Sequence, residues 1–137
     1  MTDAELIEGL ESATLTAGQF THVAHVRAAW VCLRQAPLAE ALGRYSGMVR
    51  GFAAAKGVPW KYHETMTVAY MLVIAERLAD AADASWDEFA AANPDLLSHA
   101  PSVLASYYSD GVLGSERARR GFVMPDRLLP PARSLEA

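Results

Sequence analysis

Cysteine is nearly absent from the sequence, since Cys32 is the only one among 137 residues, and a disulfide-stabilised scaffold is therefore excluded. Long apolar runs are missing as well, because no stretch reaches the roughly 18 consecutive apolar residues of a membrane helix. The N-terminus carries Asp3 and Glu5 where a signal peptide would carry basic residues. These absences predict a cytoplasmic protein with no membrane partner.

A basic surface is also lacking. Twelve lysines and arginines stand against 16 aspartates and glutamates, which gives a net charge of −4, whereas general nucleic-acid binders are normally basic. We therefore expect no nucleic-acid partner. The arginines gather near the C-terminus, a pattern that fits a solvated surface or a contact with an anion or a partner: Arg117, Arg119, Arg120, Arg127 and Arg133. The chain also lacks a Walker loop, a dinucleotide-binding fingerprint, a G-x-S-x-G elbow and an E-x-x-H pair.

The alternating pattern of β-strands is absent, whereas helix start and stop signals recur along the chain. Capping boxes begin at Thr2 and Ser85, and Thr21 can cap another helix. Pro37 and Pro59 suit first helical turns. The signals predict helices over residues 4–10, 22–35, 37–56, 60–82, 86–92, 102–108 and 116–120. We predict an all-α fold, a single compact bundle of four or five main helices over residues 1–125 with a short extended tail over residues 126–137, either as a monomer or as a homodimer.

Two histidines mark the start of the second predicted helix. Since an ideal helix turns about 100° per residue, His22 and His25 fall on one side of it. Arg27 and Arg34 fall on nearly the opposite side, which is the expected solvent face. Both imidazoles are therefore predicted to point inward. They are either core residues that hydrogen-bond to carbonyl groups, or groups that bind a metal or transfer protons.

A glutamate and a histidine stand at the start of the fourth predicted helix. Glu64 lies almost opposite the charged residues Glu76, Arg77 and Asp80, so it is predicted to point into the core, with His63 at its edge. A buried carboxylate is costly unless it is paired or binds a metal. Glu64 is therefore expected to accept a hydrogen bond from a tyrosine or a protonated histidine, or to serve as a ligand or general base.

Three histidines thus point inward from the starts of two helices. His22, His25 and His63 could meet at one end of the bundle and bind one transition metal. Neutral imidazoles favour zinc, iron, copper or nickel, and three histidines with one open position form a catalytic rather than a structural site. The fourth histidine, His99, follows two leucines in a loop and is predicted to be a surface residue. Cys32 is predicted to be a buried structural thiol.

The sequence resembles a family of small bacterial all-helical proteins of unassigned function. Two histidine-containing segments carry the resemblance, namely F-T-H-V-A-H-V-R-A-A-W at residues 20–30 and K-Y-H-E-T at residues 61–65. Later landmarks are P-D-L-L at residues 94–97, Y-Y-S at residues 107–109 and F-V-M-P-D at residues 122–126. The resemblance covers about residues 5–126 and supports the two histidine sites, but it implies no particular activity or cofactor.

These residues predict a small enzyme with a His/Glu pocket that acts on a small molecule. In one version His22, His25 and His63 hold the metal, and Glu64 serves as a base in hydrolytic or acid/base chemistry. In a second version no metal is bound, and the catalytic residues His63 and Glu64 move protons during a cyclisation, elimination or isomerisation. The alternative from another class is a module that binds a metal, a small molecule or a protein without turnover.

Overall fold

The computed structural model describes residues 1–127, and all of the regular structure in this range is helical. The all-α prediction is therefore confirmed. The predicted tail at residues 126–137 lies outside the described residues from residue 128 onward. The helices follow one another in the order α1 (Asp3–Glu11), α2 (His22–Gln35), α3 (Leu38–Ala55), the 3-10 turn η1 (Pro59–Lys61), α4 (Glu64–Ala79), α5 (Trp86–Ala92), the 3-10 turn η2 (Val103–Ser106), α6 (Asp110–Leu113) and α7 (Glu116–Arg120).

Side-chain caps begin the helices where the sequence predicts them. Thr2 Oγ1 accepts the Glu5 amide at 3.1 Å, and Thr21 Oγ1 accepts the Ala24 amide at 3.2 Å. Ser85 begins α5 with a complete capping box. Each cap satisfies an amide that has no partner within its own helix, a contribution of about 1 kcal/mol.

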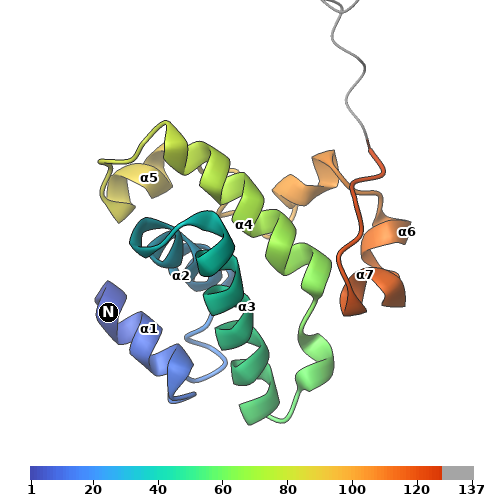
Figure 1. Cartoon of the computed structure of the whole chain (residues 1–137), viewed down its shortest axis with the longest axis horizontal. Helices are drawn as coiled ribbons and strands as arrows, with labels where there is room; N and C mark the ends of the chain where they lie inside the picture. Colours follow the sequence, from blue (N-terminus) through green and yellow to red (C-terminus); the bar gives the residue numbers. More distant parts are fainter. Residues whose placement is uncertain (128–137) are drawn as a thin grey trace, which may run out of the picture.

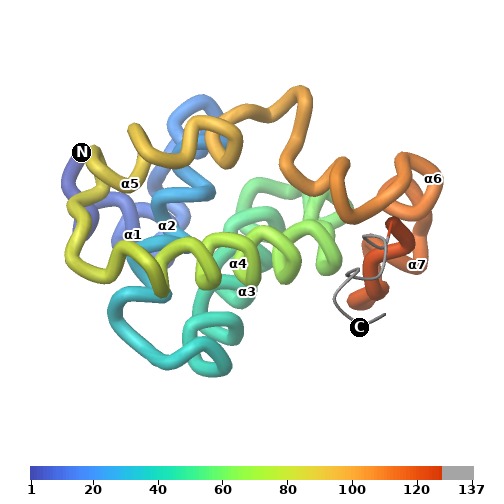
Figure 2. Tube along the Cα trace, turned by 90° about the horizontal axis from the view of Figure 1, so that it is seen from above, coloured from blue at the N-terminus to red at the C-terminus, as the bar shows by residue number. Residues whose placement is uncertain are grey.

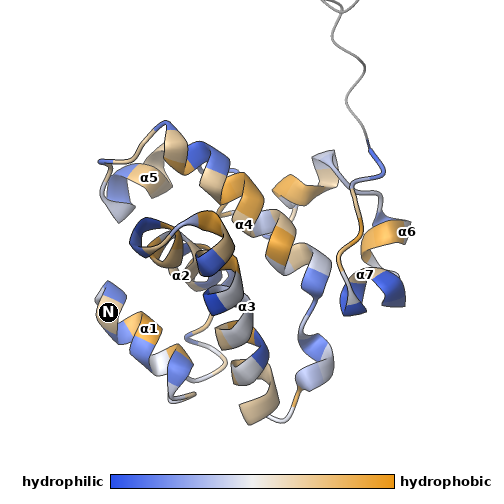
Figure 3. Ribbon diagram, in the orientation of Figure 1, coloured by the Kyte–Doolittle hydropathy of each residue, from blue (hydrophilic) through white to orange (hydrophobic). Residues whose placement is uncertain are grey.

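Helix α4 forms the centre of the molecule. In Figures 1 and 2, α2 and α3 lie alongside α4, α5 lies near the end of α4, and α6 and α7 lie near its start. The main core fills the space among α1, α2, α3 and α4, and its largest members include Leu6, Leu10, Trp30, Phe52, Met71 and Ile74. Hydrophobic residues recur along α4, as the colours of the ribbon in Figure 3 show. Among the described residues, however, no helix is both long enough and apolar enough to cross a bilayer.

A smaller core lies between the other side of α4 and the C-terminal segment, which comprises residues 103–127 of the described chain. Ala69 of α4 packs there with Leu104 and Tyr108. Thr65 is fully buried, and its hydroxyl donates to the Gly121 carbonyl at 2.8 Å while it accepts the Val123 amide at 3.0 Å. These contacts attach the chain after α7 to the first turn of α4.

The structure corrects three helix predictions. The helix expected at 60–82 instead comprises a 3-10 turn at Pro59–Lys61 and α4 at Glu64–Ala79. The segment expected to be helical at 102–108 forms only the 3-10 turn Val103–Ser106. The single turn α6 was not predicted, because four residues are too few to show a helical period. The first correction matters most, since it places Tyr62 and His63 outside the helix.

Candidate functional site

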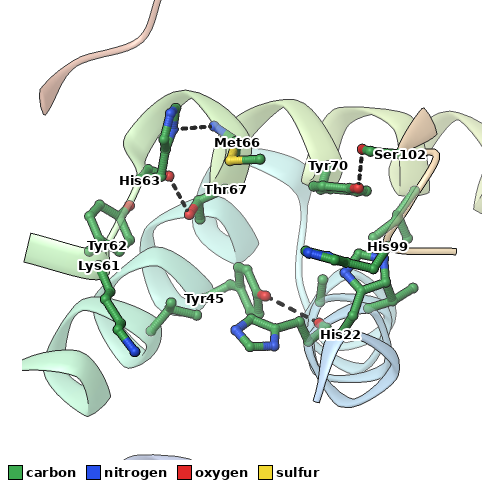
Figure 4. Close-up of a pocket in the computed structure, with 15 residues that line it drawn as sticks. His22, Tyr45, Lys61, Tyr62, His63, Met66, Thr67, Tyr70, His99 and Ser102 are labelled. Carbon is green, nitrogen blue, oxygen red and sulfur yellow. Dashed lines mark hydrogen bonds between the residues drawn. The ribbon is translucent and has the colours of Figure 1, made fainter. Parts of the chain in front are cut away.

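A cavity of about 610 Å³ opens between α2, α3, η1, α4 and the loop before η2. All four histidines of the chain line it (Figure 4). Its apolar wall comes from Val26, Ala29, Val49, Met66 and Ile74, and its polar groups include Lys61, Tyr45, Tyr62, Tyr70, Thr67 and Ser102. No aspartate or glutamate is among these described lining residues. A pocket of this size, largely apolar with a few polar groups, suits a small organic molecule.

His22 lies in the first turn of α2 because Thr21 caps that helix. Its Nε2–H donates to the carbonyl of Leu96 at 2.9 Å. Since a carbonyl oxygen can only accept, this contact fixes the tautomer and leaves Nδ1 as the acceptor of the neutral ring. Nδ1 has no hydrogen-bond partner among residues 1–127. The His22 ring meets Tyr70 and His99 edge to face, with centroid distances of 5.3 and 5.6 Å.

His25 follows one turn later with the opposite tautomer. Its Nδ1–H donates to the Thr21 carbonyl at 2.7 Å, so the neutral ring offers Nε2 as a base. One ring face stacks on Phe20 with a centroid distance of 3.5 Å. Burial lowers the pKa of His25, and the nearby rings of His22 and His99 lower it further, against the opposing effect of the Thr21 carbonyl. At neutral pH His25 is therefore an uncharged base beside an apolar cavity.

His63 has both ring nitrogens engaged. As the N-cap of α4, its Nδ1 accepts the Met66 amide at 3.1 Å. Its Nε2–H donates to the Leu113 carbonyl of α6 at 2.7 Å. The ring therefore joins the start of α4 to the end of α6, and binding a proton or a metal at either nitrogen would break one of these bonds. His63 is therefore part of the cavity wall, but neither of its ring nitrogens is free to react.

Glu64 does not point into the core, contrary to the prediction. Its side chain is 28% exposed and is not part of the cavity wall. Instead, Oε1 accepts the Tyr62 hydroxyl at 2.5 Å and lies 3.4 Å from an Arg50 nitrogen. Burial and this bond raise the pKa of Tyr62 to about 12. A tyrosine partner was one of the roles that the sequence left open for Glu64. Its predicted direction is wrong because Glu64 is the first residue of α4, where its side chain contacts Tyr62 and Arg50 instead of the core.

The three expected metal ligands line one cavity without forming a ligand cluster. Over residues 1–127, no group of three or more histidine, cysteine, aspartate or glutamate side chains is placed to hold a metal ion. His63 is committed to the capping bonds described above. Cys32 is buried, as expected, and does not line the cavity, and burial raises the pKa of its thiol. The metal site therefore remains a prediction.

Three lining groups were not assigned to the site from the sequence. His99 is exposed, as predicted, but its ring also lies against His22. Ser102 Oγ and the Tyr70 hydroxyl form a hydrogen bond of 2.5 Å across the same side of the cavity. Lys61, which is exposed, stands at the opposite side of the cavity in Figure 4. No local signal indicates these positions, since they depend on how the loop after α5 and the turn η1 fold back.

Comparison with family models, with curated proteins and with solved structures gives no match for this chain. The family resemblance described from the sequence therefore stays a prediction.

Proposed function

We propose that the protein is a small-molecule enzyme that transfers protons without a metal, with His25 as its general base. The observation that carries the proposal is the state of the His25 ring. Its Nδ1–H is held by the Thr21 carbonyl, its Nε2 has no partner among residues 1–127, and its pKa is lowered by burial in the wall of the cavity. A neutral, oriented imidazole beside an apolar cavity is suited to take a proton from a bound molecule.

The surrounding groups fit this chemistry. When Nε2 takes the proton, the Thr21 carbonyl stabilises the positive ring through the hydrogen bond that already orients it. His22 offers a second acceptor, Nδ1, for a hydroxyl or amide of the substrate. Eliminations, isomerisations and cyclisations require such a proton transfer and no other cofactor. His63 and Glu64, the catalytic pair expected from the sequence, support the cavity from outside the reaction by capping α4 and by holding Tyr62.

The test uses a generic substrate for base catalysis, 5-nitrobenzisoxazole. A base removes its ring C–H proton, the N–O bond breaks and a coloured cyanophenolate forms, so no further reactant is needed. We expect His25→Gln to lower the rate by about 10²–10⁴-fold, the usual range for a general base. Glu64→Gln is the matched control, because it removes a carboxylate at the edge of the site and can still accept the Tyr62 hydroxyl. A wild-type rate no higher than that of free imidazole, or a loss confined to Glu64→Gln, would contradict the proposal.

One observation favours the metal-dependent version as a second candidate. His22 and His25 each donate one ring N–H to a backbone carbonyl and leave the other nitrogen without a partner in residues 1–127, as metal-binding histidines do. His99 is the third imidazole on that side of the cavity, in place of the predicted His63. Elemental analysis separates the two versions. About one equivalent of zinc, iron, copper or nickel that is lost in His22→Ala and His25→Ala supports the metal site, and metal-free protein that retains the His25-dependent rate supports proton transfer.

A further inference from the structure

The charges around the cavity differ from those of the whole chain. The chain has a net charge of −4, yet its cavity is lined by four histidines and one lysine, with no carboxylate in the described wall. Lys61 is the only lysine, arginine, aspartate or glutamate among the described lining residues. A molecule that enters the cavity therefore meets a positive group while the rest of the protein is acidic.

Lys61 is not neutralised by its neighbours. It ends the 3-10 turn η1, is exposed, and forms no ion pair within residues 1–127. The nearest carboxylate in the sequence, that of Glu64, is already occupied by the Tyr62 hydroxyl and by Arg50, which also stacks on the Tyr62 ring. The ammonium group of Lys61 is thus left to pair with a ligand.

The cavity has two chemically distinct ends. In Figure 4, Lys61 stands at one side, whereas His22 and His99 stand at the other. Met66, Thr67 and Tyr45 lie between these two sides in Figure 4, so the space between them is partly apolar. A molecule that is complementary to both parts of the cavity has a negative charge at one end, for Lys61, and an apolar body next to it.

We propose that the cavity binds a small amphipathic carboxylate, with its carboxylate at Lys61 and its apolar body directed towards the histidines. A single lysine suits one negative charge. A phosphate ester carries more negative charge and more acceptor oxygens, and is usually bound by further donors such as an arginine or an open helix N-terminus. Neither is available here, because no arginine lines the described wall and His63 already occupies the Met66 amide at the start of α4. The direction in which the body points rests on the proposed function, whereas the preference for a carboxylate does not.

Three probes with one body and different charges test the ligand class. We expect 3-phenylpropanoate to bind about two- to fivefold more tightly than 3-phenylpropanamide, and 3-phenylpropylamine to bind most weakly, as one partly solvated ion pair predicts. Binding is measured by calorimetry and by NMR shifts of the histidine ring protons. High salt should reduce the advantage of the carboxylate, because the Lys61 end of the cavity is open to solvent.

Lysine occurs at only two positions in the chain, which provides a matched control. Lys61→Met should lower the affinity for the carboxylate to that of the amide and leave the amide unchanged. Lys56→Met should change neither, because Lys56 lies over the Phe52 ring and does not line the cavity. Equal affinities for the carboxylate and the amine, an unchanged affinity in Lys61→Met, or no shift of any histidine at millimolar probe would each overturn the proposal.

The same measurements separate this proposal from the proposed function. Binding is measured without turnover. If the protein prefers the carboxylate but fails the 5-nitrobenzisoxazole test, the proposed ligand class is supported and the cavity binds its ligand without catalysing this reaction. Conversely, if proton transfer depends on His25 but the three probes bind equally well, the proposed enzyme function is supported and the proposed ligand class is wrong.

Discussion

The hydrogen-bond partners of each histidine determine what its ring can do. His25 and His63 both lie close to a helix start and both line the cavity. His63 has a partner at each nitrogen, and therefore fixes structure. Within the described residues, His25 has a partner at Nδ1 alone, and therefore keeps Nε2 as a basic nitrogen. The position of His25 around the helix axis predicted correctly that it faces inward. The carbonyl groups that accept from His22 and His63 belong to residues 74 and 50 positions away, so no local sequence pattern indicates them.

The lowered pKa of His25 predicts a pH-dependent stability. Because the folded protein disfavours the charged ring, the unfolded chain binds a proton first as the pH falls below about 6.5. We therefore expect the free energy of unfolding to be highest above pH 6.5 and to fall between that pH and the lower pKa of the folded state. Urea unfolding from pH 8 to pH 5 measures the effect. His25→Gln should remove part of the slope, and an unchanged slope in that variant would show that other groups cause it.

At the scale of the elements, sequence signals fixed the helix starts better than the connections between helices. Thr21 and Ser85 cap through contacts three residues away, so their helices were predicted correctly. Pro59 suits the first turn of a 3-10 helix as well as that of an α-helix, and the sequence could not distinguish them. A rotation angle does not apply to Tyr62 and His63, which lie before the helix. Glu64 is the first residue of α4, and its contacts with Tyr62 and Arg50 are not indicated by any helical-wheel angle. The true cap, His63, is an uncommon residue at that position and gives no recognisable signal.

The cap at the start of α4 can be tested with two substitutions at one position. His63→Ala removes the acceptor of the Met66 amide and the donor to the Leu113 carbonyl, so we expect a loss of about 1–3 kcal/mol in the free energy of unfolding. His63→Asn restores a good capping side chain and should recover roughly half of that loss. Chemical denaturation measures both values. If asparagine is no better than alanine, the cap contributes little and the contact with α6 is the important one.

On the scale of the whole molecule, two sides of α4 are in contact with different parts of the protein. One side closes the cavity through Met66, Tyr70 and Ile74, and the other carries the smaller core against the C-terminal segment. The cavity therefore depends on segments that are far apart in the sequence, from α2 to the loop before η2. Composition and helix signals predicted the fold class and brought His22 and His25 to the same side. They did not predict the two-sided use of α4, because it arises from contacts such as that of Thr65 with residues 56 and 58 positions away.

Thr65→Val tests how strongly the two sides are joined. Valine keeps the shape but removes both hydrogen bonds of a fully buried hydroxyl, and so leaves the Gly121 carbonyl and the Val123 amide without their partner. We expect a loss of about 2–4 kcal/mol in the free energy of unfolding, since each unsatisfied buried group costs about 1–3 kcal/mol. Amide hydrogen exchange should accelerate first in α7 and residues 121–126, and only later in α2. Thr67→Val is the matched control on the same helix, because the His63 carbonyl that its hydroxyl contacts still accepts the amide of residue 67. If both variants lose equal stability, or if exchange accelerates equally in α2 and α7, then Thr65 does not join the C-terminal segment to α4.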